Sequence, residues 1–314
     1  MAHSPIAEAV AAAAGTITLG GDLTVNRMGF GAMRITGKGV WGEPEDRAET
    51  IRVVRRAVEL GVNFIDTADS YGPNVSERII AEALSPYPRG VVIATKGGFE
   101  RSGPDEWTEN GHPDHLRGAL DGSLKRLKVE RIDLWQLHRI DSDVPEGEQF
   151  DVLAEFVREG KVRHVGLSEV SVEQIERARK VVPIVSVQNK YNVADRRWEA
   201  VVDYCTREKI AFIPWYPLGA GNLDSSTAQR KKQAQSRAGG TGQEKLGRAQ
   251  AAIRTVAQRH QATELQVALA WLLARSPMML VIPGTSKVAH LEENVAAARL
   301  RLDAADLALL NDGR

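Results

Sequence analysis

The chain reads NFIDTADSYG over residues 63–72, a short apolar run that ends on Asp66 and is followed five residues later by Tyr71. Two further apolar runs end on groups that exchange protons, because VVIATK ends on Lys96 and LWQLH ends on His138. In a parallel barrel the carboxyl ends of the strands share one face, so these four side chains would converge over one cavity. The pattern therefore predicts a parallel α/β fold with an active site at the strand ends.

Apolar strand candidates alternate with amphipathic helices along the chain. The strand candidates begin near Met28, Val62, Val91, Ile132, Val162, Ile184, Ala211 and Met279. Helical periodicity is expected near residues 48–60, 76–84, 113–127, 149–158, 171–181, 198–207, 245–260 and 264–273. Eight strands alternating with helices predict a closed (β/α)8 TIM-type barrel rather than an open sheet, preceded by a β-hairpin at residues 16–24.

No linker or internal repeat divides the sequence, so one barrel domain is expected over residues 1–314. Residues 1–14 are alanine-rich and are expected to be disordered or weakly ordered. Residues 221–242 are rich in Ser, Gln, Gly and basic residues and are expected to form a flexible loop after the seventh strand candidate. That loop either closes over a bound anion or is a solvated insertion.

The charge balance narrows the classes of partner. Forty-one basic residues balance 41 acidic ones, which gives neither the basic surface of a nucleic-acid binder nor a polybasic patch for a membrane. The N-terminal segment lacks the features of a signal peptide, so a cytoplasmic protein is expected. The single cysteine, Cys205, is expected to be a buried filler. Small molecules remain as partners, and the sequence leaves the oligomeric state open.

Together the motifs resemble the aldo-keto reductase family. The matching segments are residues 64–72, Thr95-Lys96, DLWQLH at 133–138, IPGTS at 282–286 and Glu293-Asn294. They occur in the family's order and span nearly the whole chain. The resemblance implies a (β/α)8 barrel, NADPH as cofactor and reduction of an aldehyde or ketone to an alcohol. Ser168-Glu169 and the IPGTS segment look most like a bacterial branch that includes pyridoxal reductases, so pyridoxal is a candidate substrate.

The residue types suit this chemistry. Hydride reduction of a carbonyl leaves negative charge on its oxygen, which calls for a proton donor and charge stabilisation. Tyr71 is expected to donate the proton, Lys96 to ease proton loss from the phenol, Asp66 to hold the ammonium and His138 to orient the carbonyl. Similarity to the family assigns the same roles. Loss of Lys96 is expected to leave the fold standing, because the cation would lie in a hydrated mouth.

The cofactor must be held without a Rossmann fingerprint, because Arg34 stands where the third glycine of that motif is needed. Resemblance to the family assigns cofactor binding to Gly31, Ala32, Met33, Asp66, Ser168, Gln188, Trp215, Tyr216, Pro217, Leu218, Gly219, Gly284, Ser286, Lys287, His290, Glu293 and Asn294. Ser168 and Gln188 suit a carboxamide, and Trp215 can stack on a nicotinamide ring.

Two positions depart from the family's pattern. Glu169 stands where many members have Asn, so it is expected to accept a hydrogen bond from the carboxamide NH2 rather than donate one. Lys287 is the one permanent cation near the expected 2′-phosphate site, with His290 beside it, which predicts a modest preference for NADPH over NADH. The expected walls of the substrate pocket are Trp41, Phe99, Trp107 and Arg139.

Two other functions remain open at this point. One is an NADPH-binding regulatory subunit resembling the potassium-channel β subunits, and the other is an aldolase in which Lys96 forms a Schiff base with substrate. A metal site at His112 and His115 is not predicted, because the pair lacks a third ligand.

Overall fold

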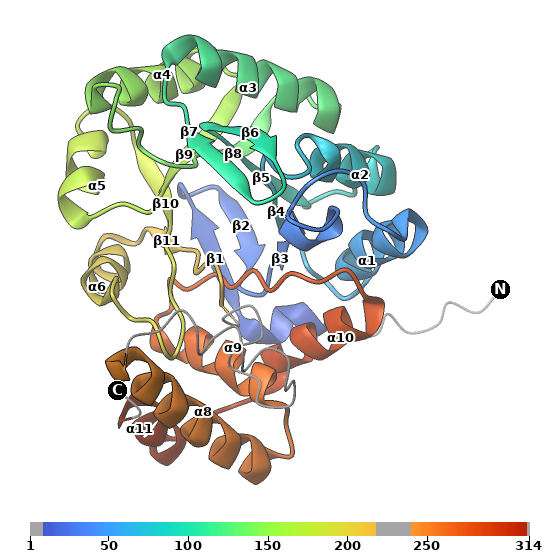
Figure 1. Cartoon of the computed structure of the whole chain (residues 1–314), viewed down its shortest axis with the longest axis vertical. Helices are drawn as coiled ribbons and strands as arrows, with labels where there is room; N and C mark the ends of the chain where they lie inside the picture. The colour runs from blue at the N-terminus through green and yellow to red at the C-terminus, as the bar shows by residue number, and fades with distance from the viewer. Residues whose placement is uncertain (1–8, 218–239, 313–314) are drawn as a thin grey trace.

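A curled parallel sheet forms the centre of the computed structural model, which describes residues 9–217 and 240–312 (Figure 1). Its seven strands pair in chain order and all run parallel. The strands are β3 (Phe30–Gly31), β4 (Phe64–Asp66), β5 (Val92–Gly97), β8 (Ile132–Leu137), β9 (Val162–Ser168), β10 (Ile184–Gln188) and β11 (Ala211–Phe212).

The segment beginning at Met279 closes the sheet into a barrel. Met279 forms a parallel bridge with Phe212 at one edge, and Val281 forms one with Met28 at the other. The Gly29 amide donates to the Val281 carbonyl at 2.8 Å. The eighth strand candidate is therefore present as single-residue bridges rather than as a regular strand. The predicted (β/α)8 barrel is confirmed.

Helices surround the sheet on its outer side (Figure 1). They are α1 (Arg47–Glu59), α2 (Val75–Leu84), α3 (Pro113–Leu127), α4 (Glu146–Arg158), α5 (Val172–Arg179), α6 (Glu199–Glu208), α8 (Gly240–His260), α9 (Glu264–Arg275), α10 (Val288–Ala296) and α11 (Ala304–Asp312). Each helix that the periodicity predicts is present within a few residues of its expected bounds. The last two are additional, and the apolar residues of α11 are too evenly distributed to signal one buried face.

The amino end of the barrel is sealed by the predicted hairpin, β1 (Thr16–Leu19) and β2 (Leu23–Asn26), which is antiparallel. Its apolar side chains form one core with residues of the barrel strands. The core includes Ile17, Leu19, Leu23 and Val25 of the hairpin and Phe64, Val92, Leu134 and Ala211 of the strands. The open end of the barrel is therefore the carboxyl end, where an active site is expected.

Residues 10–14 differ from the predicted weak order. They form the 3-10 helix η1 (Val10–Ala14), in which Ala11 is buried and donates its amide to the Leu60 carbonyl at 3.0 Å. This contact with the end of α1 is long-range, so local composition does not reveal it.

A second hairpin, β6 (Phe99–Gly103) and β7 (Glu106–Glu109), follows β5 directly and was not expected from the sequence. Of the predicted flexible loop, residues 221–239 lie outside the described residues, and residues 240–242 begin α8. Cys205 is buried as predicted, and burial raises the pKa of its thiol to about 12. Within the described ranges, no helix combines the length and apolar character needed to cross a bilayer.

Candidate active site

Asp66, Tyr71, Lys96 and His138 come together at the carboxyl end of the barrel. Asp66 and Lys96 belong to β4 and β5, Tyr71 to the loop after β4, and His138 follows β8. Lys96 Nζ donates to Asp66 Oδ2 at 2.7 Å and to the Thr67 carbonyl at 2.8 Å. The same ammonium lies 3.4 Å from the Tyr71 hydroxyl. The structure thus places a phenol beside a cation that is itself paired with a carboxylate.

The Asp66–Lys96 pair lies in the interior rather than in a hydrated mouth, since the side chains are 3% and 0% exposed. Burial is the largest single influence and lowers the pKa of Lys96, but the charges and hydrogen bonds of Asp66 and Tyr71 together outweigh it, and the net pKa is raised. Asp66 Oδ1 also accepts from Gln136 Nε2 at 3.1 Å and from Gln188 Nε2 at 2.9 Å. The sequence analysis did not identify Gln136 as a site residue. Its position two residues before His138 could have indicated it, because alternate residues of a strand lie on the same face.

Tyr71 retains its proton at neutral pH. Burial raises the pKa of the phenol, and the nearby Lys96 ammonium opposes this effect without cancelling it. The expected influence of Lys96 is therefore present, but it is smaller than the effect of burial. In this state the hydroxyl is available as a proton donor.

His138 is neutral. Burial, followed by the charges of Lys96, Arg139 and Arg101, lowers the pKa of the imidazole well below its ordinary value. Its Nδ1 lies 3.5 Å from Ser70 Oγ. Among the described residues its Nε2 has no hydrogen-bond partner, so this atom can orient an oxygen in the cavity but does not supply a cation.

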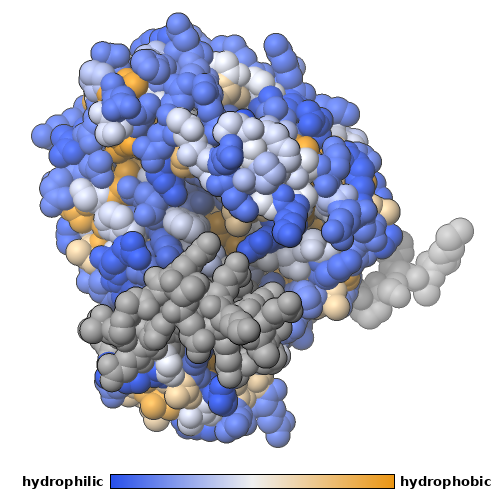
Figure 2. Space-filling view, in the orientation of Figure 1, coloured by the Kyte–Doolittle hydropathy of each residue, from blue (hydrophilic) through white to orange (hydrophobic). Residues whose placement is uncertain are grey.

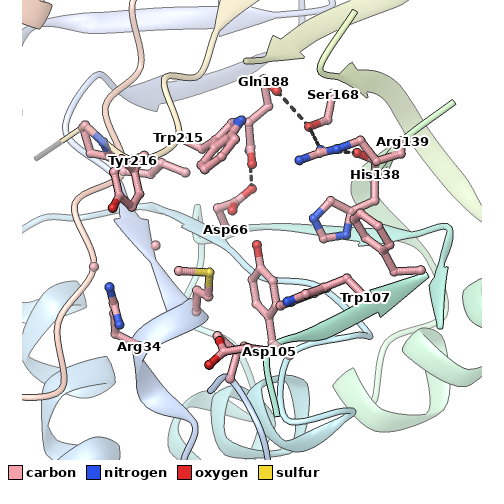
Figure 3. A pocket seen from close by; sticks show the side chains of 18 residues that line it. Arg34, Asp66, Asp105, Trp107, His138, Arg139, Ser168, Gln188, Trp215 and Tyr216 are labelled. Atoms are coloured by element: carbon pink, nitrogen blue, oxygen red, sulfur yellow. Dashed lines mark hydrogen bonds between the residues drawn. The ribbon is translucent and has the colours of Figure 1, made fainter. Parts of the chain in front are cut away.

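Asp66, Tyr71 and His138 open onto a cavity of about 480 Å³, whereas Lys96 is not among its lining residues. Figure 2 shows the hollow, with apolar residues deep inside it. The lining residues are Gly31, Met33, Arg34, Val40, Asp66, Tyr71, Phe99, Asp105, Trp107, His138, Arg139, Ser168, Gln188, Trp215, Tyr216, Pro217, Ile282 and Gly284 (Figure 3). The unpredicted β6–β7 hairpin thus contributes two aromatic walls and Asp105.

One expected wall is misplaced. Trp41 is not among the residues lining the cavity, and its ring packs 5.7 Å from the Arg101 guanidinium. The same guanidinium lies 3.6 Å from the Trp107 ring and donates to the Ser70 carbonyl at 2.8 Å. Trp41 therefore packs against Arg101 of the hairpin rather than lining the cavity.

The residues assigned to the cofactor by resemblance fall into three groups. Those that line the cavity are Gly31, Met33, Asp66, Ser168, Gln188, Trp215, Tyr216, Pro217 and Gly284. Those that lie outside its lining are Ala32, Ser286, Lys287, His290, Glu293 and Asn294. Leu218 and Gly219 fall outside the described residues. At the barrel closure a Cβ on Gly284 would lie 2.4 Å from the Gly31 carbonyl oxygen, so glycine permits this close approach.

Glu169 makes contacts other than the one expected. Its Oε1 accepts from the Trp215 indole Nε1 at 2.6 Å and from the Lys190 amide at 2.5 Å. The residue has a φ of 55°, in the left-handed region, at the end of β9. Glu169 does not line the cavity; it fixes the edge of Trp215, which does. Nothing in the local sequence signals this contact, because 46 residues separate the two side chains.

The start of α10 carries the expected phosphate-binding cation. Lys287 is the N-cap residue and is exposed, as is His290. Glu49 Oε1 accepts from the Val288 amide at 3.1 Å, and this bond is the largest cause of the lowered pKa of Glu49. A carboxylate therefore already occupies one amide of this helix terminus.

Comparison with known proteins places this geometry in a family. A sequence model described as "Aldo/keto reductase family" matches residues 27–312. The chain belongs to this family. The match includes all four polar residues of the site, and the resemblance read from the motifs is confirmed.

Individual aldo/keto reductase relatives cover nearly the full length. The chain is 49% identical over 302 residues to an uncharacterised oxidoreductase of Schizosaccharomyces pombe, covering 96% of this chain and 90% of that protein. It is 42% identical over 303 residues to pyridoxine 4-dehydrogenase of Escherichia coli, covering 94% and 97%. The solved structure of a glycerol dehydrogenase from Gluconobacter oxydans aligns with a TM-score of 0.85 at 27% identity, covering 96% and 95%.

Proposed function

We propose that this aldo/keto reductase reduces an aldehyde or ketone to the alcohol with NADPH, and that Tyr71 donates the proton. The observation that carries the proposal is the neutral phenol of Tyr71, 3.4 Å from the buried Lys96 ammonium. It opens onto an aromatic-lined cavity. Pyridoxal is a candidate substrate, because the chain is 42% identical to a pyridoxine 4-dehydrogenase.

The residues around Trp215 fit a nicotinamide. Ser168 Oγ donates to the Gln188 carbonyl at 2.8 Å, and Gln188 Nε2 donates to Asp66. This leaves Gln188 Oε1 without a partner among the described residues, and it can accept from a carboxamide NH2. The indole of Trp215, held at its edge by Glu169, offers a ring face for stacking. The bound cofactor supplies the hydride.

The chain's own residues would then manage the proton and the charge. His138 Nε2 orients the carbonyl oxygen, and the Tyr71 hydroxyl transfers its proton to that oxygen as negative charge develops. The ammonium of Lys96 stabilises the phenolate that remains. Asp66 keeps the ammonium charged and in place through its 2.7 Å bond.

This function is tested directly by incubating the protein with NADPH and a set of aldehydes and ketones that includes pyridoxal, and by measuring the decrease in NADPH absorbance. Turnover with one or more aldehydes is expected. NADPH binding without any turnover would favour the regulatory-subunit alternative. Borohydride trapping of a substrate adduct on Lys96, with no NADPH oxidation, would favour the aldolase.

The proposed preference for NADPH rests on Lys287 and is weakened by Glu49. An ammonium near a 2′-phosphate forms a charge-assisted hydrogen bond, whereas a carboxylate at the same helix terminus repels the phosphate. Lys287→Ala should therefore lower the ratio of NADPH to NADH affinity, and Glu49→Gln should raise it. An unchanged ratio in both variants would place the phosphate elsewhere.

A further inference from the structure

Arg139 directly follows His138 and reaches into the same cavity. Its Nη1 donates to the His138 carbonyl at 2.6 Å and to Ser168 Oγ at 3.0 Å. The guanidinium carbon lies 5.4 Å from the Phe99 ring centre and 5.8 Å from that of Trp215. Figure 3 shows the guanidinium extending toward the cavity between Ser168 and His138.

Two other partly buried arginines of the barrel have their donors satisfied. Arg27 and Arg101 each use Nε, Nη1 and Nη2 on carbonyl oxygens. Within the described residues, Arg139 donates hydrogen bonds only from Nη1, and its Nε and Nη2 have no hydrogen-bond partner there. Neither nitrogen is among the buried polar atoms that lack a partner, so both are accessible from the cavity and can donate to a ligand there.

Arg139 also lacks a counter-ion within the described part of the chain, where no carboxylate forms an ion pair with it. Burial lowers the pKa of Arg139, and the charges of Glu169, of ionised Tyr71 and of Glu109 oppose this only through space. Glu169 Oε1 is engaged by Trp215 and Lys190. A guanidinium nevertheless stays protonated in proteins, so the cavity wall carries a positive charge.

The carboxylates that line the cavity do not neutralise this charge. Asp66 is already paired with Lys96. Figure 3 shows Asp105 on the other side of the cavity from Arg139. An anionic group beside Arg139 would therefore meet a cation, flanked by aromatic walls that accept a planar ring.

We propose that Arg139 binds an anionic oxygen of the substrate, so that the preferred substrates are aldehydes or ketones that carry a carboxylate or an ionised hydroxyl. This inference rests on the proposed carbonyl reduction. A carboxylate can take two parallel bonds from the guanidinium fork, which also fixes the ring relative to Tyr71 and His138.

Matched pairs of substrates test the assignment. The 3- and 4-carboxybenzaldehydes are compared with their methyl esters, which keep the ring and an electron-withdrawing substituent but remove the charge. The expected kcat/KM ratio of acid to ester is about 10 to 100 in the wild type. Arg139→Gln should bring the ratio close to one, and Arg139→Lys should retain part of it. Arg34→Gln, which removes an exposed cation from the same cavity, is the matched control and should keep the ratio.

A binding measurement separates this proposal from the proposed function. Benzoate and benzamide are titrated by calorimetry into the NADPH complex of the wild type and of Arg139→Gln. Benzoate should bind the wild type at least about 10-fold more tightly than benzamide, and the variant should lose that difference. If the ratio of benzoate to benzamide affinity is the same in the wild type and in Arg139→Gln, the proposed role of Arg139 is wrong. It is also wrong if Arg139→Gln loses affinity for NADPH but keeps the preference for benzoate. Absence of turnover with the benzoate preference intact would overturn only the proposed reaction.

Discussion

Replacing Lys96 with methionine gives the sharpest test of the buried pair. The substitution keeps an unbranched side chain that is one atom shorter, but it removes the cation that bonds Asp66 at 2.7 Å. Sequence reasoning predicts an intact fold for this variant, on the view that the ammonium lies in a hydrated mouth. The structure contradicts that view, because the Lys96 side chain is 0% exposed. The variant would leave a carboxylate in the interior without its counter-charge.

The expected effect follows from that geometry. Breaking a buried ion pair by removing one partner costs about 3–5 kcal/mol. The lower end applies here, because Asp66 Oδ1 keeps its bonds from Gln136 and Gln188. With an unfolding entropy of about 2.1 cal/mol/K per residue and 314 residues, a loss of about 3 kcal/mol lowers Tm by about 5 °C and a loss of about 5 kcal/mol lowers it by about 8 °C. Calorimetry and denaturant titration measure the change, and the turnover of the folded variant measures the loss of catalysis.

A double variant identifies the source of the instability. Asp66→Asn combined with Lys96→Met removes both charges while keeping an oxygen that can accept from the two glutamines. Its stability should recover most of the loss, because no uncompensated charge remains. A Lys96→Met protein as stable as the wild type would refute the reasoning. A double variant as unstable as the single one would show that the orphaned carboxylate is not the cause.

Three further predictions concern the surrounding residues. Tyr71→Phe should lower kcat about 10²- to 10⁴-fold while NADPH still binds; near-normal turnover would remove Tyr71 from the mechanism. Glu169→Ala should weaken NADPH binding when Trp215 is present, but it should not weaken binding further in a protein that already carries Trp215→Phe. If the losses of NADPH affinity from the two substitutions simply add, Glu169 does not act through the indole. Burial raises the pKa of Asp69 from 3.8 to about 7, so its ionisation opposes folding increasingly as pH rises. The stability of Asp69→Asn relative to wild type should therefore increase by about 2–3 kcal/mol from pH 5 to pH 8, and a pH-independent difference in denaturant titrations would contradict the assignment.

The barrel and the four polar residues were predictable because each depends on a local pattern. A strand buried on both sides reads as a continuous apolar run, and the residue that ends it marks the carboxyl face. Asp66, Lys96 and His138 each end such a run, so topology alone brings them together.

The β6–β7 hairpin was not predictable in the same way. Burial does alternate along β6, but the residues on its inner face are Phe99, Arg101 and Gly103, of which only Phe99 is apolar, and β7 has one half-buried position. The sequence therefore lacks the apolar alternation that signals a half-buried strand. It is held by long-range contacts, chiefly the bonds of Arg101 to the carbonyls of Gly39, Val40 and Ser70. Contacts of this kind depend on the closed barrel and leave no periodic trace in the chain.

Arg139 shows a related limit. Consecutive residues of a strand point to opposite faces, so alternation would place Arg139 away from His138. Both line the cavity because β8 ends at Leu137 and the chain turns at that point. The sequence identifies Arg139 as a wall only through its position after a strand, whereas its free donors become visible only when its neighbours are placed.

Under the proposed mechanism, the electrostatics of the site give the two directions of the reaction different pH dependences. Burial raises the pKa of Tyr71, so the phenol already carries the proton that the proposed carbonyl reduction would consume. The pKa of Lys96 is raised and that of His138 is lowered well below its usual value, so neither changes its charge over the neutral range. The reverse reaction, oxidation of the alcohol, would instead need a phenolate at Tyr71 to take up a proton. If Tyr71 has the proposed role, the rate of oxidation should rise at alkaline pH, whereas reduction should start from the protonation state that the site holds at neutral pH.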